Sequence, residues 1–208
     1  SAYPDAAVVC YINSSAEVKA ESDVCVTSGN ALRIIEQLPE ERILFVPDRI
    51  MADNLQRDLE SRGIEKEILS SKGTCIVHDQ FTAVEIEEER VRLPGLSVVS
   101  HPECTVEVTE ASDFVGSTQG MMEYVRKSDS PYFMMLTECG LVGRLEAENP
   151  GKDFTGSCRL CPYMKLNSLA KVRDVLVNPE PSQVIEIDPT IVSAAKQSLD
   201  RMFELGSS

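Results

Sequence analysis

The chain has 208 residues, 42% of them hydrophobic, which is enough to bury one or two globular cores. It carries 20 lysines and arginines against 34 aspartates and glutamates, and the net charge of −14 disfavours nucleic acid and anionic membranes as partners. No apolar run approaches the roughly 18 residues of a membrane-spanning helix, and the first residues lack the pattern of a signal peptide. We therefore expect a cytoplasmic protein with no nucleic-acid or membrane partner.

Short apolar runs alternate along the chain with segments of helical spacing. This alternation predicts an α/β fold with short parallel sheets covered by helices. We expect strands at residues 7–12, 24–26, 43–46, 97–99, 114–115 and 132–136. We expect helices at residues 29–38, 48–62, 81–90, 119–126, 139–148, 166–177 and 189–205. The last helix has an amphipathic stripe that must cover another surface.

The chain matches itself when it is shifted by 90 positions. At this shift residues 43–46 meet 133–136, and Asp48 meets Glu138. We interpret the match as two pseudo-symmetric copies of one small αβα unit. Each copy closes with a segment that presents a cysteine, Cys75 or Cys161, although these two are 86 residues apart. We expect the repeat to end there, so that the following helices have a different character.

The segment 101–104 delivers an imidazole, a carboxylate and a thiol directly after an apolar run. At the shift of 90, Tyr11 and Asn13 take the places of His101 and Glu103. Ligands of parallel α/β sheets bind at the carboxyl ends of strands, so these four side chains are candidate site residues. An ordinary surface turn with a small buried cysteine is the alternative interpretation.

Hydroxyl-rich turns follow the next predicted strand of each copy. Ser28 lies in the first turn, and Ser117 and Thr118 lie in the second. Each turn opens a helix and can direct hydroxyls and backbone N–H groups at a carboxylate or phosphate. Simple helix capping is the other use of such residues.

Seven cysteines are present, but a disulfide framework is not expected in a chain of this size without a secretory signal. Three of them adjoin apolar runs and are expected to be small core residues: Cys10, Cys25 and Cys139. Cys158 and Cys161 form an isolated C-x-x-C pair, a weak pattern for zinc or for a redox dithiol. An iron–sulfur cluster held by Cys75 and Cys161 fits the loop positions better.

Motifs along the chain resemble those of the quinolinate synthases, the A proteins of NAD biosynthesis. The resemblance spans essentially the whole chain but only part of the family's length. The motifs are YINSSAEVKA at 11–20, VTSGNA at 26–31, PD at 47–48, KGTCIVH at 72–78, HPEC at 101–104, STQGM at 117–121 and CPYMK at 161–165.

This resemblance implies three pseudo-symmetric three-layer αβα domains around a [4Fe–4S] cluster, two of which are present in this sequence. It implies a transferase that condenses iminoaspartate with dihydroxyacetone phosphate, with an aspartate oxidase or dehydrogenase as the partner that supplies iminoaspartate. Cys75 and Cys161 match two cluster ligands, and the third is expected in a first domain that this sequence lacks. Cys158 or Cys104 is the alternative third ligand.

Other residues match by motif as well. His101 and Glu103 match the catalytic acid–base pair beside the open iron. Matches to substrate-binding positions are Tyr11, Asn13, Ser28, Ser117 and Thr118. The implied domains are residues 1–90 (the family's second domain), 91–161 (its third) and 162–208, a helical segment expected to pack on the missing first domain. Two other functions stay open: a non-catalytic binding module with an incomplete cluster site, and a zinc or dithiol protein centred on Cys158 and Cys161.

Overall fold

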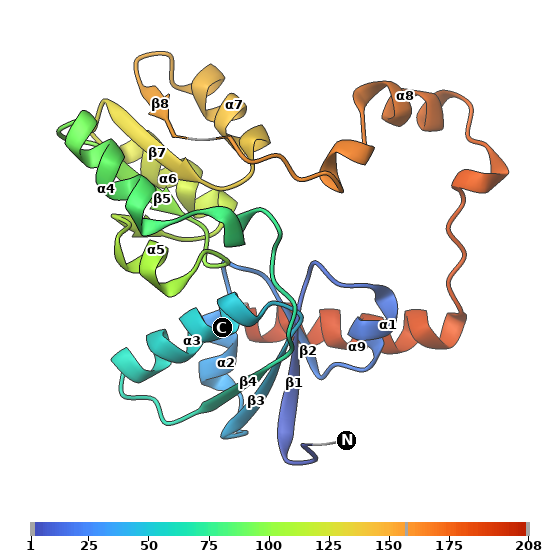
Figure 1. Ribbon diagram of the computed structural model, residues 1–208. Coiled ribbons are helices and arrows are strands. Elements are labelled where there is room, and N and C mark those ends of the chain that lie inside the picture. Colours follow the sequence, from blue (N-terminus) through green and yellow to red (C-terminus); the bar gives the residue numbers. More distant parts are fainter. Residues whose placement is uncertain (1–2, 157, 207–208) are drawn as a thin grey trace.

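The computed structural model describes residues 3–156 and 158–206, which form two four-stranded, all-parallel sheets (Figure 1). The first sheet has the order β2-β1-β3-β4, and the second has the equivalent order β6-β5-β7-β8. Parallel neighbours need a crossover connection, and the helices between the strands provide it. The predicted α/β fold with repeated αβα units is confirmed.

The first repeat contains β1 (Ala6–Tyr11), α1 (Ala16–Ala20), β2 (Val24–Val26), α2 (Ala31–Gln37), β3 (Arg42–Val46), α3 (Arg49–Ser61) and β4 (Glu67–Ser70). A 3-10 helix, η1 (His78–Gln80), and α4 (Ala83–Arg92) lead to the second repeat. That repeat contains β5 (Ser97–Ser100), α5 (Val106–Glu110), β6 (Phe114–Val115), α6 (Thr118–Lys127), β7 (Tyr132–Leu136), α7 (Cys139–Glu148) and β8 (Asp153–Thr155). The C-terminal part contains η2 (Met164–Leu166), α8 (Leu169–Val177), η3 (Pro181–Gln183) and α9 (Pro189–Gly206). Among the described residues, no helix is both long and apolar enough to span a bilayer.

The predicted repeat holds at the level of strand register. In the first sheet, Val9 of β1 lies opposite Val24 of β2. In the second sheet, Val99 of β5 lies opposite Phe114 of β6. Val99 and Phe114 lie 90 positions after Val9 and Val24, respectively. The two sheets therefore correspond residue by residue at their centres.

The shorter spacing of the two cysteines has a structural cause. Helix α3 has 13 residues, whereas its counterpart α7 has 10. The strands that follow these helices begin at Glu67 and Asp153, which are already 86 positions apart. Cys75 and Cys161 therefore follow equivalent strands of the two sheets, as the sequence comparison predicted from their loops.

The repeat does not end at the second cysteine, so our prediction of an unrelated C-terminal region is wrong for α8. At the displacement of 86, η1 corresponds to η2, and Thr82, the N-cap of α4, corresponds to Ser168, the N-cap of α8. Helix α4 packs on the second sheet through Ile86, which is 1% exposed. The counterpart of Ile86 in α8 is Val172, which is 51% exposed.

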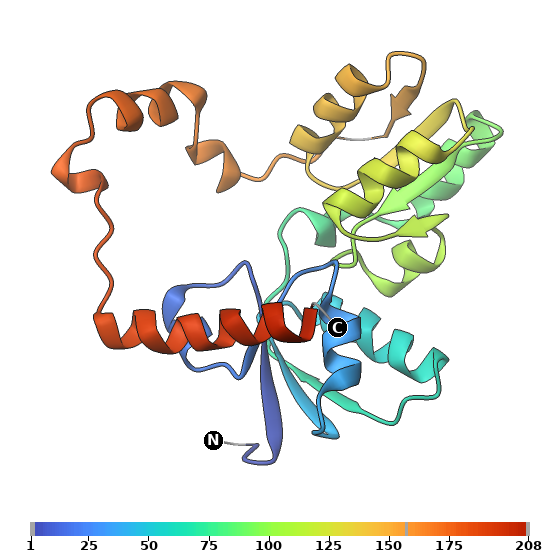
Figure 2. The same ribbon diagram turned by 180° about the vertical axis from the view of Figure 1, so that it is seen from behind.

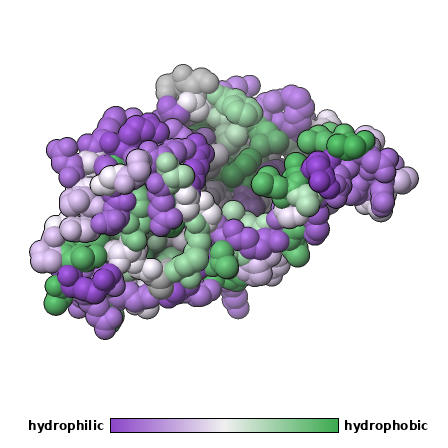
Figure 3. Space-filling model, turned by 90° about the horizontal axis from the view of Figure 1, so that it is seen from above, coloured by the Kyte–Doolittle hydropathy of each residue, from purple (hydrophilic) through white to green (hydrophobic). Residues whose placement is uncertain are grey.

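Helix α8 stands away from both sheets on an extended arm, as two opposite views show (Figures 1 and 2). The arm, residues 162–188, exposes large apolar side chains, and from above hydrophobic residues surround a hollow between it and the body (Figure 3). The most exposed of them include Tyr163, Leu169, Leu176, Val177 and Ile185. Nothing in the described part of the chain covers this apolar face.

Helix α9 returns from the arm and packs on the first repeat, against α1, α2 and β2. The Ser198 hydroxyl donates to the Lys19 carbonyl at 2.9 Å, and the Gln37 side chain donates to the Leu205 carbonyl at 3.2 Å. The packing of α9 thus differs from our expectation for residues 162–208, because its buried stripe already has a partner within the sequence. The three-part division at residues 90 and 161 stays a prediction.

Candidate functional site

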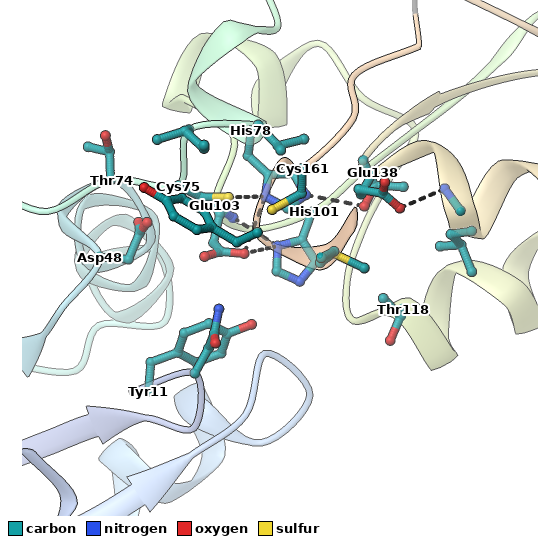
Figure 4. Close-up of a pocket in the computed structure, with 18 of the residues that line it drawn as sticks. Tyr11, Asp48, Thr74, Cys75, His78, His101, Glu103, Thr118, Glu138 and Cys161 are labelled. Atoms are coloured by element: carbon teal, nitrogen blue, oxygen red, sulfur yellow. Dashed lines mark hydrogen bonds and ion pairs between the residues drawn. The ribbon is translucent and has the colours of Figure 1, made fainter. Parts of the chain in front are cut away.

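A cavity of about 760 Å³ lies between the two repeats, where the carboxyl ends of their strands meet (Figure 4). Two predicted site residues, Ser28 and Ser117, do not line it. The other predicted site residues all line it: Tyr11, Asn13, Cys75, His101, Glu103, Thr118 and Cys161. The fold thus brings residues up to 150 positions apart (161 − 11) into one site, although their individual roles stay predictions.

The end of β1 contributes neutral polar groups to the cavity. Tyr11 is the last residue of β1 and is 9% exposed, and Asn13 follows it in the exposed turn before α1. Burial, together with the nearby Glu103 charge, raises the pKa of Tyr11, and the Ser28 side chain hydrogen-bonds to it. Tyr11 therefore keeps its proton, and Ser28 supports it from behind the cavity wall.

Ser117 has a capping role in the structure. Its side chain accepts a hydrogen bond from the Gly120 N–H at 3.2 Å, at the start of α6. It also lies against the equivalent turn of the first repeat, because a Cβ on Gly29 would be 3.4 Å from the Ser117 hydroxyl oxygen. Ser117 thus marks the place where the two repeats meet, and Thr118 beside it reaches the cavity.

Two histidines flank one glutamate at the centre of the site (Figure 4). Glu103 Oε2 lies 3.0 Å from His101 Nδ1 and 3.3 Å from His78 Nδ1. The imidazole rings stack with centroids 4.6 Å apart. His78 also contacts the Cys75 sulfur at 3.1 Å through Nδ1 and the Thr137 hydroxyl at 3.2 Å through Nε2.

Burial and hydrogen bonding shift the pKa values of these three groups in different directions. Burial disfavours the Glu103 carboxylate, but hydrogen bonds from His101 and His78 outweigh it and lower the pKa of Glu103 to about 2. Burial also disfavours protonation of His78, but contacts with Cys75 and Glu103 raise its pKa to about 9. Burial and the adjacent His78 lower the pKa of His101. At neutral pH the site therefore holds a His78–Glu103 ion pair beside a neutral imidazole.

His78 is the main site residue to which we assigned no role from the sequence. It lies in η1, three residues after Cys75, and is 7% exposed. A signal was present, since His78 closes the same motif as Cys75, but only the fold shows that it faces Glu103. The ligand atoms of Cys75, His78 and Glu103 lie within 4.8 Å of one another, so this group could hold a metal ion.

Two acidic residues at equivalent strand ends also line the cavity, Asp48 after β3 and Glu138 after β7. Burial, with a contribution from the Glu103 charge, raises the pKa of Asp48 to about 6. Burial acts in the same direction on Glu138, but Lys165, at 2.9 Å, and the Gly140 N–H lower its pKa. The sequence comparison aligned these two acids but did not place them in the site.

The cysteines correct four of our expectations. Cys139 and Cys158 form a disulfide with a Cα–Cα distance of 5.4 Å, although no disulfide was expected. Cys139 is half-buried at the start of α7, so it is not a core residue. Cys158 pairs with Cys139 and not with Cys161, which contradicts both the C-x-x-C dithiol and the use of Cys158 as a third cluster ligand. Separation along the chain hid this pairing, which the α7–β8 packing creates.

The remaining thiols fall into two groups. Cys10 and Cys25 are fully buried in the first core, as expected. Cys104 is also fully buried, with its sulfur 3.4 Å from the Leu136 carbonyl, and burial raises its pKa to about 12. Cys104 is therefore a packing residue and a poor metal ligand. Within the described ranges, the free thiols that line the cavity are those of Cys75 and Cys161.

Comparison with known proteins shows which family the chain resembles. The family described as "Quinolinate synthetase A protein" matches residues 1–204. The chain is 40% identical to the quinolinate synthase of Sinorhizobium fredii over 203 residues, 98% of this chain and 55% of that protein. It is 42% identical to quinolinate synthase 1 of Mesorhizobium japonicum, over 96% of this chain and 60% of the relative. The chain thus spans a little over half the length of these curated relatives.

Proposed function

The chain belongs to the quinolinate synthetase A protein family, and we propose that its cavity forms part of a quinolinate synthase active site. The proposed reaction condenses iminoaspartate with dihydroxyacetone phosphate and closes the ring of quinolinate for NAD biosynthesis. One observation carries the proposal: equivalent loops of the two repeats bring Cys75 and Cys161 to the cavity that also holds His101 and Glu103.

The donor set of the cavity fits part of an iron–sulfur site. Cys75 and Cys161 are half-buried, free and on the same cavity, which suits thiolate ligation. We propose that they supply two ligands of a [4Fe–4S] cluster and that the third cysteine comes from a further αβα unit. When bound, such a cluster supplies an iron with an open position that polarises a substrate oxygen.

The central network is suited to moving protons. Condensation, dehydration and ring closure each need an acid or a base within hydrogen-bond reach. Glu103 stays ionised and accepts a hydrogen bond from His101 Nδ1, while the neutral His101 can accept a proton at its free nitrogen and then return it. The protonated His78 keeps Glu103 ionised and adds a positive charge that favours an anionic substrate.

Substrate binding is assigned to the residues around this network. Tyr11 and Asn13 offer neutral donors from the first repeat, and Thr118 lies at the start of α6, where unpaired N–H groups suit phosphate or carboxylate oxygens. Ser28 and Ser117 were predicted to bind substrate directly, and we now propose that they support Tyr11 and the α6 N-terminus. Such local donors allow an acidic protein to bind anionic substrates.

The exposed arm supports the proposed domain arrangement. Helix α4 follows the first cysteine loop and covers the next sheet, and α8 follows the second cysteine loop at the equivalent position. By the same geometry, we propose that α8 covers the sheet of a further αβα unit. Its exposed apolar residues, including Val172, would then be buried like Ile86 of α4.

Anaerobic assay of the natural-length polypeptide that carries these residues tests the proposed function. Iminoaspartate is generated by an aspartate oxidase or dehydrogenase, the proposed supplier, and quinolinate is measured by chromatography. We expect quinolinate formation, with loss of bound iron and of activity in Cys75→Ser and Cys161→Ser. Cys10→Ala, which removes a buried thiol away from the cavity, is the control and should keep both.

A non-catalytic binding module is the second candidate function. It is favoured by the two cavity thiols of the described chain, because two thiolates hold a cubane cluster weakly. A natural-length protein that binds a dicarboxylate but forms no quinolinate would support this candidate and contradict the first.

A further inference from the structure

The loop after β4 brings a thiol and an imidazole together. Cys75 lies in this loop, and His78 begins η1 three positions later. The Asp79 N–H donates to the Cys75 carbonyl at 3.0 Å, which closes a turn between them. The Cys75 sulfur and His78 Nδ1 are 3.1 Å apart. Two atoms that bind transition metals well therefore lie side by side at the cavity wall.

The second repeat adds a third ligand atom at the same place (Figure 4). Glu103 follows β5, and its Oε2 lies 3.3 Å from His78 Nδ1. The ligand atoms of Cys75, His78 and Glu103 are all within 4.8 Å of one another. Bond lengths of about 2.0–2.3 Å in tetrahedral zinc sites place neighbouring ligand atoms roughly 3.3–3.7 Å apart. Small side-chain movements are therefore enough to close the three atoms around one ion.

The groups behind these ligands are also those of a metal site. His78 Nε2 is 3.2 Å from the hydroxyl of Thr137, which is 4% exposed. This hydroxyl can accept a hydrogen bond from Nε2–H, which leaves the Nδ1 lone pair for an ion. His101 Nδ1 lies 3.0 Å from Glu103 Oε2 and holds the carboxylate from the other side. Such outer contacts commonly orient imidazole and carboxylate ligands.

We propose that Cys75, His78 and Glu103 form a site for one divalent ion of the zinc class, with a fourth position open to the cavity. Thiolate and imidazole ligands favour Zn²⁺ over Mg²⁺ and Ca²⁺, which prefer oxygen ligands. The ion would join the loop of the first repeat to the strand end of the second. The site needs Cys75 but not Cys161, so it is distinct from the proposed cluster.

Titration of the cluster-free, reduced 208-residue chain with Co²⁺, a spectroscopic substitute for Zn²⁺, tests the site. We expect one equivalent to bind, with a thiolate-to-cobalt charge-transfer band and the intense d–d bands of four-coordinate cobalt, and Zn²⁺ to abolish both. Cys75→Ser should lose the charge-transfer band, and His78→Gln and Glu103→Gln should weaken binding at least about 100-fold. A wild type without the band, or a band that survives Cys75→Ser, would overturn the proposal.

Matched variants separate this site from other uses of the cavity thiols. Cys161→Ser keeps all three ligands and should keep the band and the affinity, whereas equal loss in Cys161→Ser and Cys75→Ser would contradict the proposal. Thr137→Val removes only the outer hydroxyl, so we expect about ten-fold weaker binding with the same spectrum. Circular dichroism checks folding. If a variant of a buried ligand does not fold, Cys75→Ser and Cys75→Ala decide, because Cys75 is half-buried.

A second measurement asks whether the ion and the cluster exclude each other through Cys75, a consequence that rests on the proposed function. We expect the natural-length protein, preloaded with Zn²⁺, to lose its capacity to take up the cluster under anaerobic conditions, and Mg²⁺ to have no such effect. Full cluster uptake with Zn²⁺ still bound would contradict the shared ligand. If the zinc-free protein takes up no cluster, the proposed function fails, while the cobalt titration still decides whether the site exists.

Discussion

The two repeats have the same strand order and register, but their equivalent strand ends carry different chemistry. After β1, the first repeat places Tyr11 and Asn13 in the cavity, and both are neutral at physiological pH. After β5, the second repeat places His101 and Glu103 there. Both side chains are titratable, and the pKa of each is lowered in the site. The backbone positions correspond, so the side chains alone distinguish a half suited to binding from a half suited to proton transfer.

The acidic caps differ in a similar way. Glu138 has Lys165 at 2.9 Å, which keeps its pKa low against the effect of burial. No ion pair joins Asp48 to a lysine or arginine in the described part of the chain, and burial raises its pKa to about 6. Both acids nevertheless cap a helix, Asp48 at the start of α3 and Glu138 at the start of α7, so this capping role does not depend on the neighbouring cation.

The largest effect is expected from a substitution of Glu103, in the half that we propose to transfer protons. Glu103→Gln keeps the size of the side chain but removes its charge and its basicity. We expect kcat for quinolinate formation to fall at least about 100-fold with little change in KM, because a positioned acid or base contributes about 10²–10⁴-fold. Steady-state kinetics of the natural-length enzyme measures both constants, and unchanged turnover would remove Glu103 from the assigned role.

The His78–Glu103 pair should make stability depend on pH in a defined direction. The raised pKa of His78 stabilises the fold fully below its ordinary value of 6.5, and this contribution is lost as pH rises through about 9. The lowered pKa of Glu103 acts above its ordinary value of 4.5, and its contribution is lost as pH falls through about 2. The pair is therefore fully effective between these two ordinary values.

Urea unfolding of wild type and His78→Gln at pH 6 and pH 9.5 checks this expectation. The difference in unfolding free energy should shrink at the higher pH by on the order of 3 kcal/mol, since one pKa unit corresponds to about 1.4 kcal/mol. His101→Gln is the control, because a lowered histidine pKa has its effect below pH 6.5. A difference for His78→Gln that is the same at both pH values would contradict the ion pair.

Reduction of the disulfide should affect one repeat only. The Cys139–Cys158 bond closes a 19-residue separation in the second repeat, and the first repeat has no disulfide in its described residues. We expect a reductant to destabilise α7 and β8 by about 2 kcal/mol and to leave β1–β3 unchanged. Hydrogen exchange with and without reductant measures this. An equal response in both repeats, or a response in the Cys139→Ser/Cys158→Ser variant, would contradict it.

The smallest effect is expected in the binding half. Asn13 occupies the position equivalent to Glu103, but Asn13→Ala removes only a neutral hydrogen-bonding group. We expect KM to rise about ten-fold while kcat changes less than about three-fold. If kcat fell as far as in Glu103→Gln, the division between a binding repeat and a proton-transfer repeat would be wrong.

Local patterns in the sequence were sufficient for most of the scaffold. Apolar runs located six strands, and the match at a shift of 90 located the two repeats, because buried parallel strands need continuous hydrophobic residues. Strands β4 and β8 and helices α1 and α5 were missed. Each has no more than five residues and is stabilised mainly by its neighbours, so its own sequence carries little signal.

By itself, the sequence determined the fold class, the repeat, the family resemblance and the side chains at the strand ends, since these depend on local order along the chain. Only the tertiary structure decided which groups meet: His78 with Glu103, Cys139 with Cys158, and the backbones of residues 48 and 138 with those of Gly73 and Arg159. It also showed that α8 continues the repeat with its apolar face exposed. Such pairings depend on helix length and on how the sheets pack, and contacts between distant segments leave no periodic pattern in the sequence.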